Sequence, residues 1–140
     1  MADEIAADEI ILRHVPPGTL WQAPGPRITS MNFRLRPDKG ETGVSVTRQG
    51  ITSAERLMVV VGGDAAAGSL VGAAKVGDVR DLGFEVEPVP LPDDPGHSEI
   101  RSGKASLNDG PMRKRLANLF RILPSAGEAT PARDESAKPA

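Results

Sequence analysis

The sequence predicts an α+β protein with a small, mostly antiparallel sheet and two or three helices. Segments 28–35 and 84–89 alternate between apolar and polar residues with the period of two that is typical of strands. Segment 111–123 instead repeats apolar residues at the spacing of a helix. Strand and helix patterns that occupy separate parts of one short chain are typical of the α+β class.

The chain of 140 residues has room for one small domain and its tails. We expect a single folded unit at 9–123. Residues 1–8 are acidic and are expected to form a flexible N-terminus. Residues 124–140 consist mainly of Ala, Pro, Glu, Ser and Lys. Such a composition cannot offset the entropy cost of ordering, so this tail is predicted to be disordered.

The first half of the chain predicts three short strands, at 10–14, 28–35 and 43–47. In the second of these, the alternation places Met31, Phe33 and Leu35 on a core face. The turn residues at 37–40 would join the second and third strands as a hairpin. The preceding segment, 19–26, is expected to be a loop.

The second half predicts a helix at 52–60, a strand at 69–75, a helical turn at 76–82, a strand at 84–89 and a helix at 111–123. The first helix opens with Thr52-Ser53-Ala54-Glu55, which fits the capping-box pattern, and Gly62 would end it. Gly83 is placed as the C-cap of the helical turn, and Pro111 suits the first turn of the last helix.

Composition excludes several functional classes. The net charge of −2 is unlike the strongly basic balance of nucleic-acid-binding domains, so nucleic acid is not favoured as a partner. The absence of cysteine excludes disulfides, thiol catalysis and thiolate metal sites. The longest apolar-rich stretch, 57–61, is too short to span a membrane, and the acidic start has no signal-peptide pattern. We expect a cytoplasmic protein without a cofactor.

His97 follows a stiff, acidic turn that contains Asp94 and two prolines. Because the chain has no Cys and no Tyr, His97 is one of very few side chains able to move a proton near neutral pH. Asp94 would orient its ring, and the ring itself would be partly exposed. The plainer alternative is that Asp-Pro-Gly is common turn chemistry and that His97 only follows it. A metal site is not expected, because His14 is the only other histidine.

Two further groups of residues could bind a ligand. Arg27 and Ser30 lie near the start of the strand predicted at 28–35, where a guanidinium fork could hold a phosphate or a carboxylate. The alternative for this pair is a solvated strand edge. Arg113 and Arg115 place basic charge on the last predicted helix and could contact an acidic partner. Such a run is also typical of the solvated face of an amphipathic helix.

Four short motifs, at 13–17, 27–33, 90–100 and 113–117, together resemble a family of small uncharacterised bacterial proteins. That family has a Pro-Pro start, an Arg-Pro-Ser-Ser…Phe strand, a Leu-Pro-x-Asp-Pro-x-His-Ala loop and a terminal Lys-Arg-Leu-Ala helix, and no activity is assigned to it. The resemblance implies an accessory role in a mobile or defence-like gene neighbourhood. This chain departs from the pattern at Ile28, which replaces the Pro, and at Ser98, which replaces the Ala.

These observations favour an accessory or protein-interaction protein, because no catalytic motif stands out and the core is small. Its partner would be another protein, and the sequence does not specify an oligomeric state. The alternative is an enzyme that acts on a phosphate-bearing substrate, a nucleotide or nucleic acid. Arg27 would then hold the anion and Ser30 would donate a hydrogen bond or act as nucleophile. His97 would be the acid or base, oriented by Asp94, and would have to lie near Arg27.

Overall fold

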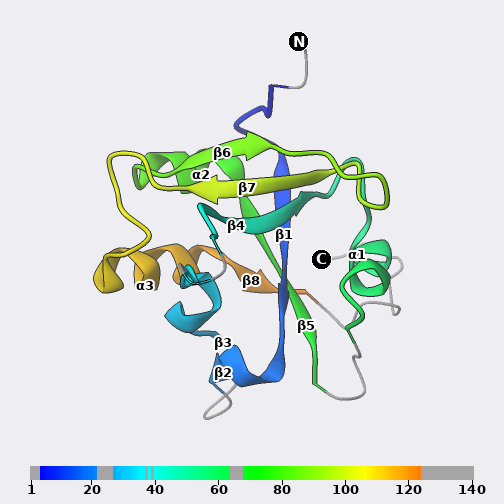
Figure 1. The fold of residues 1–140 in the computed structure, drawn as a ribbon, viewed down its shortest axis with the longest axis horizontal. Coiled ribbons are helices and arrows are strands. Elements are labelled where there is room, and N and C mark those ends of the chain that lie inside the picture. Colours follow the sequence, from blue (N-terminus) through cyan, green and yellow to red (C-terminus); the bar gives the residue numbers. More distant parts are fainter. Residues whose placement is uncertain (1–3, 22–26, 37, 39, 64–67, 124–140) are drawn as a thin grey trace.

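A computed structural model describes residues 4–21, 27–36, 38, 40–63 and 68–123 of the chain. Within these residues, a six-stranded antiparallel sheet packs with three α-helices, so the predicted α+β class is confirmed (Figure 1). The tail at 124–140 and its predicted disorder lie outside the described residues.

The six strands of the main sheet are, in spatial order, β6 (Glu85–Pro88), β7 (His97–Arg101), β4 (Gly43–Arg48), β1 (Ile10–Val15), β5 (Leu70–Lys75) and β8 (Arg121–Ile122). A second, two-stranded sheet consists of β2 (Leu20–Trp21) and β3 (Arg27–Ile28). The helices are α1 (Ala54–Val60), α2 (Val76–Asp81) and α3 (Gly110–Leu119), with 3₁₀ turns at η1 (Pro17–Thr19) and η2 (Ser30–Phe33).

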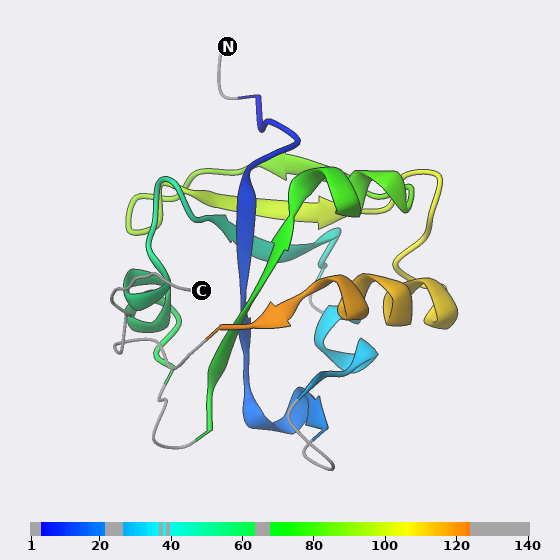
Figure 2. The same ribbon diagram turned by 180° about the vertical axis from the view of Figure 1, so that it is seen from behind.

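The main sheet has two halves that meet at a short seam. β1 pairs with β5 along its whole length, and β4 pairs with β7 from Gly43 to Thr47. Between the halves, β1 and β4 are in register only at Ile11–Arg48 and Leu12–Thr47. Beyond this seam the two strands run in different directions, as both views of the ribbon show (Figures 1 and 2). This split in the sheet creates the space for the site described below.

The core is divided by β1, whose two faces are both covered. Ile11 and Val15 belong to the larger cluster, which lies with α2, α3 and η2. In that cluster the rings of Phe33 and Phe120 pack with their centroids 5.1 Å apart. Leu12 points to the other face, where it joins a smaller cluster under α1. The alternation of side chains along a strand explains why neighbouring residues of β1 enter different clusters.

The prediction of a strand at 28–35 is wrong. After Ile28 the chain enters the 3₁₀ turn η2, so Met31, expected in the core, is 54% exposed, whereas Ile28 is buried. Phe33 is buried as predicted. The predicted hairpin is also wrong, because β4 pairs with β1 and β7. A strand needs a partner with which to share its backbone hydrogen bonds, and this stretch has none beyond the two residue pairs of β2 and β3.

Most other predicted elements are confirmed, with corrected ends. Strands β1, β4, β5 and β6 and helices α1 and α2 lie at the expected places. The N-cap of α1 is Ser53, whose hydroxyl accepts from the Arg56 N–H, and not Thr52. Gly62 ends α1 with a φ of 68°. The last helix stops at Leu119 and the chain continues as β8, so the helix predicted through residue 123 is too long.

The loop predicted at 19–26 is also corrected, because Leu20–Trp21 forms β2. The remaining part of that segment, 22–26, lies outside the described residues. His97, expected in a loop after the turn, is instead the first residue of strand β7, which was not predicted. This placement fixes the imidazole on the face of the sheet.

Candidate functional site

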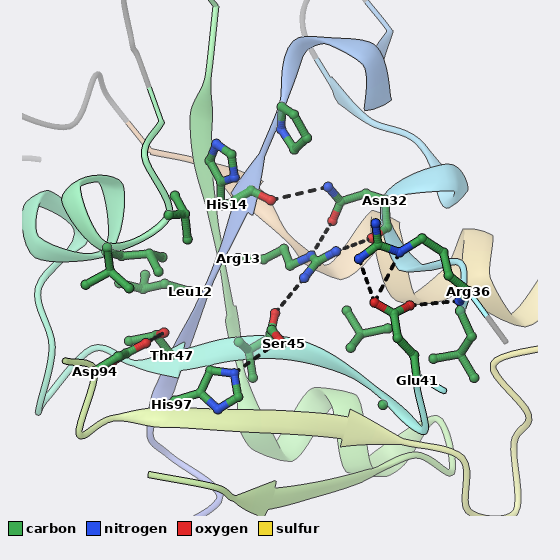
Figure 3. Close-up of a pocket in the computed structure, with 18 of the residues that line it drawn as sticks. Leu12, Arg13, His14, Asn32, Arg36, Glu41, Ser45, Thr47, Asp94 and His97 are labelled. Atoms are coloured by element: carbon green, nitrogen blue, oxygen red, sulfur yellow. Dashed lines mark hydrogen bonds and ion pairs between the residues drawn. The ribbon is translucent and has the colours of Figure 1, made fainter. Parts of the chain in front are cut away.

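A cavity of about 800 Å³ lies over the split between β1 and β4, and we refer to it as the β1–β4 groove (Figure 3). Strands β1 and β4 form its floor, α1 forms one wall and the segment from η2 to Glu41 forms the other. Its polar lining includes Arg13, His14, Asn32, Arg36, Glu41, Ser45, Thr47, Asp94 and His97. Three parts of the chain that are far apart in the sequence therefore contribute polar side chains to one space.

Arg13 fills the gap that opens where β1 and β4 diverge. Strand alternation places it between Ile11 and Val15 on the core face of β1. Its Nε donates to Asn32 Oδ1 (2.8 Å), its Nη2 donates to the Asn32 carbonyl (2.6 Å) and its Nη1 donates to the Ser45 carbonyl (2.8 Å). These bonds replace the ladder that β1 and β4 do not form beyond their seam.

The hydrogen-bond acceptors around the Arg13 guanidinium are uncharged groups. Burial lowers the pKa of Arg13 to about 10, an effect that the negative charge of Glu41 opposes. The guanidinium therefore remains protonated at neutral pH. Glu41 itself forms an ion pair with Arg36 at 2.6 Å on the wall of the groove, and Arg36 lowers the pKa of Glu41 through this hydrogen bond. The result is a half-buried cation close to the floor of the groove.

Asp94 lies at the opposite end of the groove, near α1 (Figure 3). Its side chain is almost fully buried, with 1% exposure. Oδ2 accepts a hydrogen bond from the Thr47 hydroxyl at 2.7 Å, whereas the buried Oδ1 has no partner among the described residues. Its backbone is held by paired hydrogen bonds with Leu91 at 3.1 Å. A rigid turn thus carries a carboxylate oxygen whose hydrogen-bonding capacity is unused.

His97 is half-buried, in agreement with the expected partial exposure. Its Nδ1 lies 2.8 Å from the Val89 carbonyl and its Nε2 lies 3.1 Å from Ser45 Oγ. Because a carbonyl can only accept, Nδ1 carries the proton and Nε2 accepts from the serine. The prediction that Asp94 orients this ring is wrong, since the side-chain bond of Asp94 goes to Thr47.

The other residues predicted from the sequence lie elsewhere. Arg27 is exposed on β3 and Ser30 begins η2, and neither lines the groove that contains Asp94 and His97. The structure therefore does not assemble the site that the phosphate-enzyme hypothesis requires. On α3, the Arg113 guanidinium donates to the Leu107 carbonyl at 2.9 Å within the fold, while Arg115 is exposed.

Sequence reasoning missed Arg13 and Ser45 as members of the site. A signal for Arg13 was present, because a charged residue stands between Ile11 and Val15 on the buried face of a strand. Asn32, which accepts from Arg13 and donates to the His14 carbonyl at 3.3 Å, was hidden by the wrong strand prediction. Ser45 carried no signal, since a serine on the exposed face of a strand is ordinary.

Both histidines of the chain line the groove. His14 Nε2 lies 3.2 Å from Ser69 Oγ, and the pKa of His14 is lowered by burial and, to a smaller extent, by the charge of Arg13. The part of the chain that the structure describes has no group of three or more His, Cys, Asp or Glu side chains able to hold a metal ion. None of its helices is long and apolar enough to cross a membrane.

No family model, curated protein or solved structure matches the chain. The chemistry of the groove is therefore the basis for the functional proposals.

Proposed function

We propose that the chain is an accessory protein that binds another protein, and that the β1–β4 groove receives a partner segment with a basic side chain. The observation that carries this proposal is the buried Asp94 Oδ1, which lacks a hydrogen-bond partner within the described fold. An accessory role is also what the resemblance to small bacterial proteins implies.

An unsatisfied carboxylate oxygen in a buried place is costly. Leaving such an acceptor without a partner costs about 1–3 kcal/mol, and more when the group is charged. A lysine ammonium or an arginine guanidinium supplies both the missing N–H and the opposite charge, which makes the hydrogen bond stronger than a neutral one. A basic side chain is therefore the ligand group that best completes Asp94.

Glu41, a second carboxylate that lines the groove, is already paired. Glu41 accepts from the Arg36 backbone N–H at 2.7 Å, from Arg36 Nε at 3.1 Å and from Arg36 Nη2 at 2.6 Å. The Arg13 charge lies on the same side of the groove, next to Asn32 (Figure 3). A basic side chain is thus directed toward Asp94 and away from the wall that carries the arginines.

Apolar surface beside Asp94 indicates that the partner group is part of a longer, partly apolar segment. The exposed large hydrophobic residues that the structure describes are five, and three of them line the groove: Met31, Val61 and Leu91. Exposed apolar residues that cluster around a polar depression are typical of an interaction site. A segment that combines apolar residues with one basic side chain fits this surface.

The proposal is tested with two synthetic peptides, acetyl-Ala-Leu-Lys-Leu-Ala-amide and the same peptide with norleucine in place of lysine. Binding is followed by amide chemical shifts in NMR titrations. We expect the lysine peptide to shift the signals of Asp94 and Thr47 and to bind roughly tenfold more tightly than the norleucine peptide, as one charge-assisted hydrogen bond predicts.

Variants at neighbouring positions provide the matched control. Asp94→Asn removes the charge but can still accept from Thr47, whereas Asp93→Asn removes the same charge from an exposed neighbour. The preference for lysine should disappear in the first variant and persist in the second. Equal binding of the two peptides by the wild type, or an unchanged preference in Asp94→Asn, would overturn the proposal.

A further inference from the structure

Ser45 and His97 are neighbours on the same face of the sheet. In the β4–β7 register Thr47 stands opposite His97, and Ser45 lies two residues along β4 on the same face. Ser45 is exposed and His97 is half-buried, so both can be reached from the groove. The distance of 3.1 Å between Ser45 Oγ and His97 Nε2 is within hydrogen-bond reach.

A third group fixes the imidazole. The Val89 N–H donates to the His97 carbonyl at 2.9 Å, and the Val89 carbonyl accepts from His97 Nδ1 at 2.8 Å. This reciprocal pair holds the ring and its tautomer, with the lone pair of Nε2 directed at the serine. A nucleophile, a base and a group that orients the base are the three parts of an activated serine.

A positive charge lies next to the serine. Arg13 Nη1 donates to the carbonyl of Ser45 itself at 2.8 Å (Figure 3). Because Arg13 is half-buried, its charge is screened less by water than that of a fully exposed side chain. Negative charge that develops on a substrate oxygen beside Ser45 is therefore stabilised in advance.

We infer that the β1–β4 groove is also a hydrolytic site for small, uncharged carboxylic esters, with Ser45 as the nucleophile and His97 as the general base. Ser45 Oγ forms a bond to the ester carbonyl carbon while its proton moves to His97 Nε2. The tetrahedral intermediate collapses, the ester C–O bond breaks, and the leaving alcohol takes the proton from Nε2. Water then attacks the acyl-serine, with His97 again accepting and returning a proton, so that the acid is released and Ser45 is restored.

The apolar side of the groove determines which acyl group the site can bind. Leu57 and Val60 of α1, and Val61 directly after it, line the wall, and Leu12 lies on the floor. These side chains favour a short aliphatic acyl chain. Asp94 takes no part in any step, so this inference does not rest on the binding of a basic partner segment.

The chain contains its own control. His14 Nε2 and Ser69 Oγ lie 3.2 Å apart and form a second Ser–His pair. Ser69 is only 6% exposed and does not line the groove. Loss of Ser69 therefore reports the effect of breaking a Ser–His hydrogen bond inside the fold, whereas a reaction in the groove requires Ser45.

The test measures p-nitrophenyl butyrate hydrolysis by the full chain, together with covalent labelling by a fluorophosphonate probe located by mass spectrometry. The variants are Ser45→Ala and His97→Asn, in which the Asn side chain can still donate to the Val89 carbonyl. Ser69→Ala is the control. We expect the first two variants to lose activity by about a hundredfold or more and the label to sit on Ser45. Ser69→Ala should retain both the activity and the label.

Hydrolysis that survives in Ser45→Ala would overturn the inference, because exposed imidazoles cleave activated esters without a serine. A wild-type chain that neither turns over the ester nor takes up the probe on Ser45 would also overturn it. Circular dichroism of each variant establishes that it is folded.

A second measurement keeps the inference testable if an alanine variant fails to fold. The chain has no cysteine, so Ser45→Cys introduces a single thiol. If His97 acts as a base toward position 45, iodoacetamide should alkylate this thiol several-fold faster than in the Ser45→Cys, His97→Asn double variant. Equal rates would show that His97 does not activate position 45.

Discussion

The two ends of the β1–β4 groove hold charged side chains that differ in how completely they are hydrogen-bonded. Arg13 has three hydrogen bonds to uncharged acceptors, which come from η2 and β4. Asp94 has one side-chain hydrogen bond, from Thr47, and a buried oxygen without a partner in the described fold. The satisfied charge is part of the architecture, because it joins strands that do not pair. We propose that the unsatisfied charge is the one that a partner's basic side chain completes.

The difference follows from where each side chain begins. Arg13 starts on the core face of β1 and reaches the Ser45 carbonyl, where β4 is no longer paired with β1, and the Asn32 carbonyl of η2. Asp94 belongs to a turn whose backbone is fixed by its own hydrogen bonds, so the side chain cannot move to find a second donor.

The largest effect is expected from Arg13→Met. The methionine keeps much of the apolar stem but removes every donor, so the side-chain oxygen of the buried Asn32 and the Ser45 carbonyl lose their partner. We expect the free energy of unfolding to fall by about 3 kcal/mol in urea melts. The exposed Arg34→Met is the control and should change it by less than about 0.5 kcal/mol. A loss below about 1 kcal/mol for Arg13→Met would mean that Arg13 does not hold the sheet together.

Thr47→Val tests the Asp94 end. The substitution keeps the shape of the buried side chain but removes the only donor that the described fold offers to Asp94 Oδ2. Leaving both carboxylate oxygens unsatisfied should lower the free energy of unfolding by about 2 kcal/mol. In an Asp94→Asn background the same substitution should cost less, because the buried group is then neutral. Identical costs in the two backgrounds would show that Thr47 and Asp94 are not coupled.

His97→Ala is expected to have a smaller effect. The half-buried ring loses hydrogen bonds to the Val89 carbonyl and to Ser45, both of which lie close to solvent. We expect a loss of about 1 kcal/mol in denaturant melts, near the upper end of ordinary surface changes. A loss above about 3 kcal/mol would instead mean that the His97 ring stabilises the fold. The proposed hydrolysis would then be tested with the Ser45 variants alone.

The elements with a clear local signal could be predicted from the sequence. The start of α1 within one residue, the glycine stop at Gly62 and the apolar alternation at 84–89 act within a few residues, so the local pattern contains the cause. The prediction of a strand at 28–35 failed because three apolar residues at a spacing of two do not determine whether a pairing strand exists. The partner expected for it, β4, pairs instead with β1 and β7, which are remote in the sequence.

The site was predicted only in part for the same reason. His97 and Asp94 were recognised because they stand out chemically in a proline-bounded turn. Their partners, Ser45 and Thr47, come from β4, about fifty residues earlier, through a register that only the folded sheet defines. Arg27 and Ser30 were grouped with them by residue type, and the fold places that pair outside the groove.

The smallest effect is a pH dependence that reports the charge of Arg13. Burial, and to a lesser extent Arg13, lower the pKa of His14 from its ordinary value of 6.5. The folded chain therefore resists protonation of His14, whereas the unfolded chain accepts the proton below pH 6.5. The contribution of His14 to stability is present above pH 6.5 and is lost as the pH falls toward the folded pKa. Glu9 and Glu41, whose pKa values are lowered from 4.5, lose their contributions only at lower pH.

Urea melts between about pH 7 and pH 5 should thus show a decline in the free energy of unfolding that is weaker in His14→Gln than in the wild type. NMR titration of the His14 ring gives its pKa directly. In Arg13→Met this pKa should rise toward 6.5, because the neighbouring positive charge is gone while much of the burial remains. A pKa that does not move in that variant would show that His14 does not sense Arg13. The positive charge of Arg13 would then have no effect on the protonation of its neighbour in the groove.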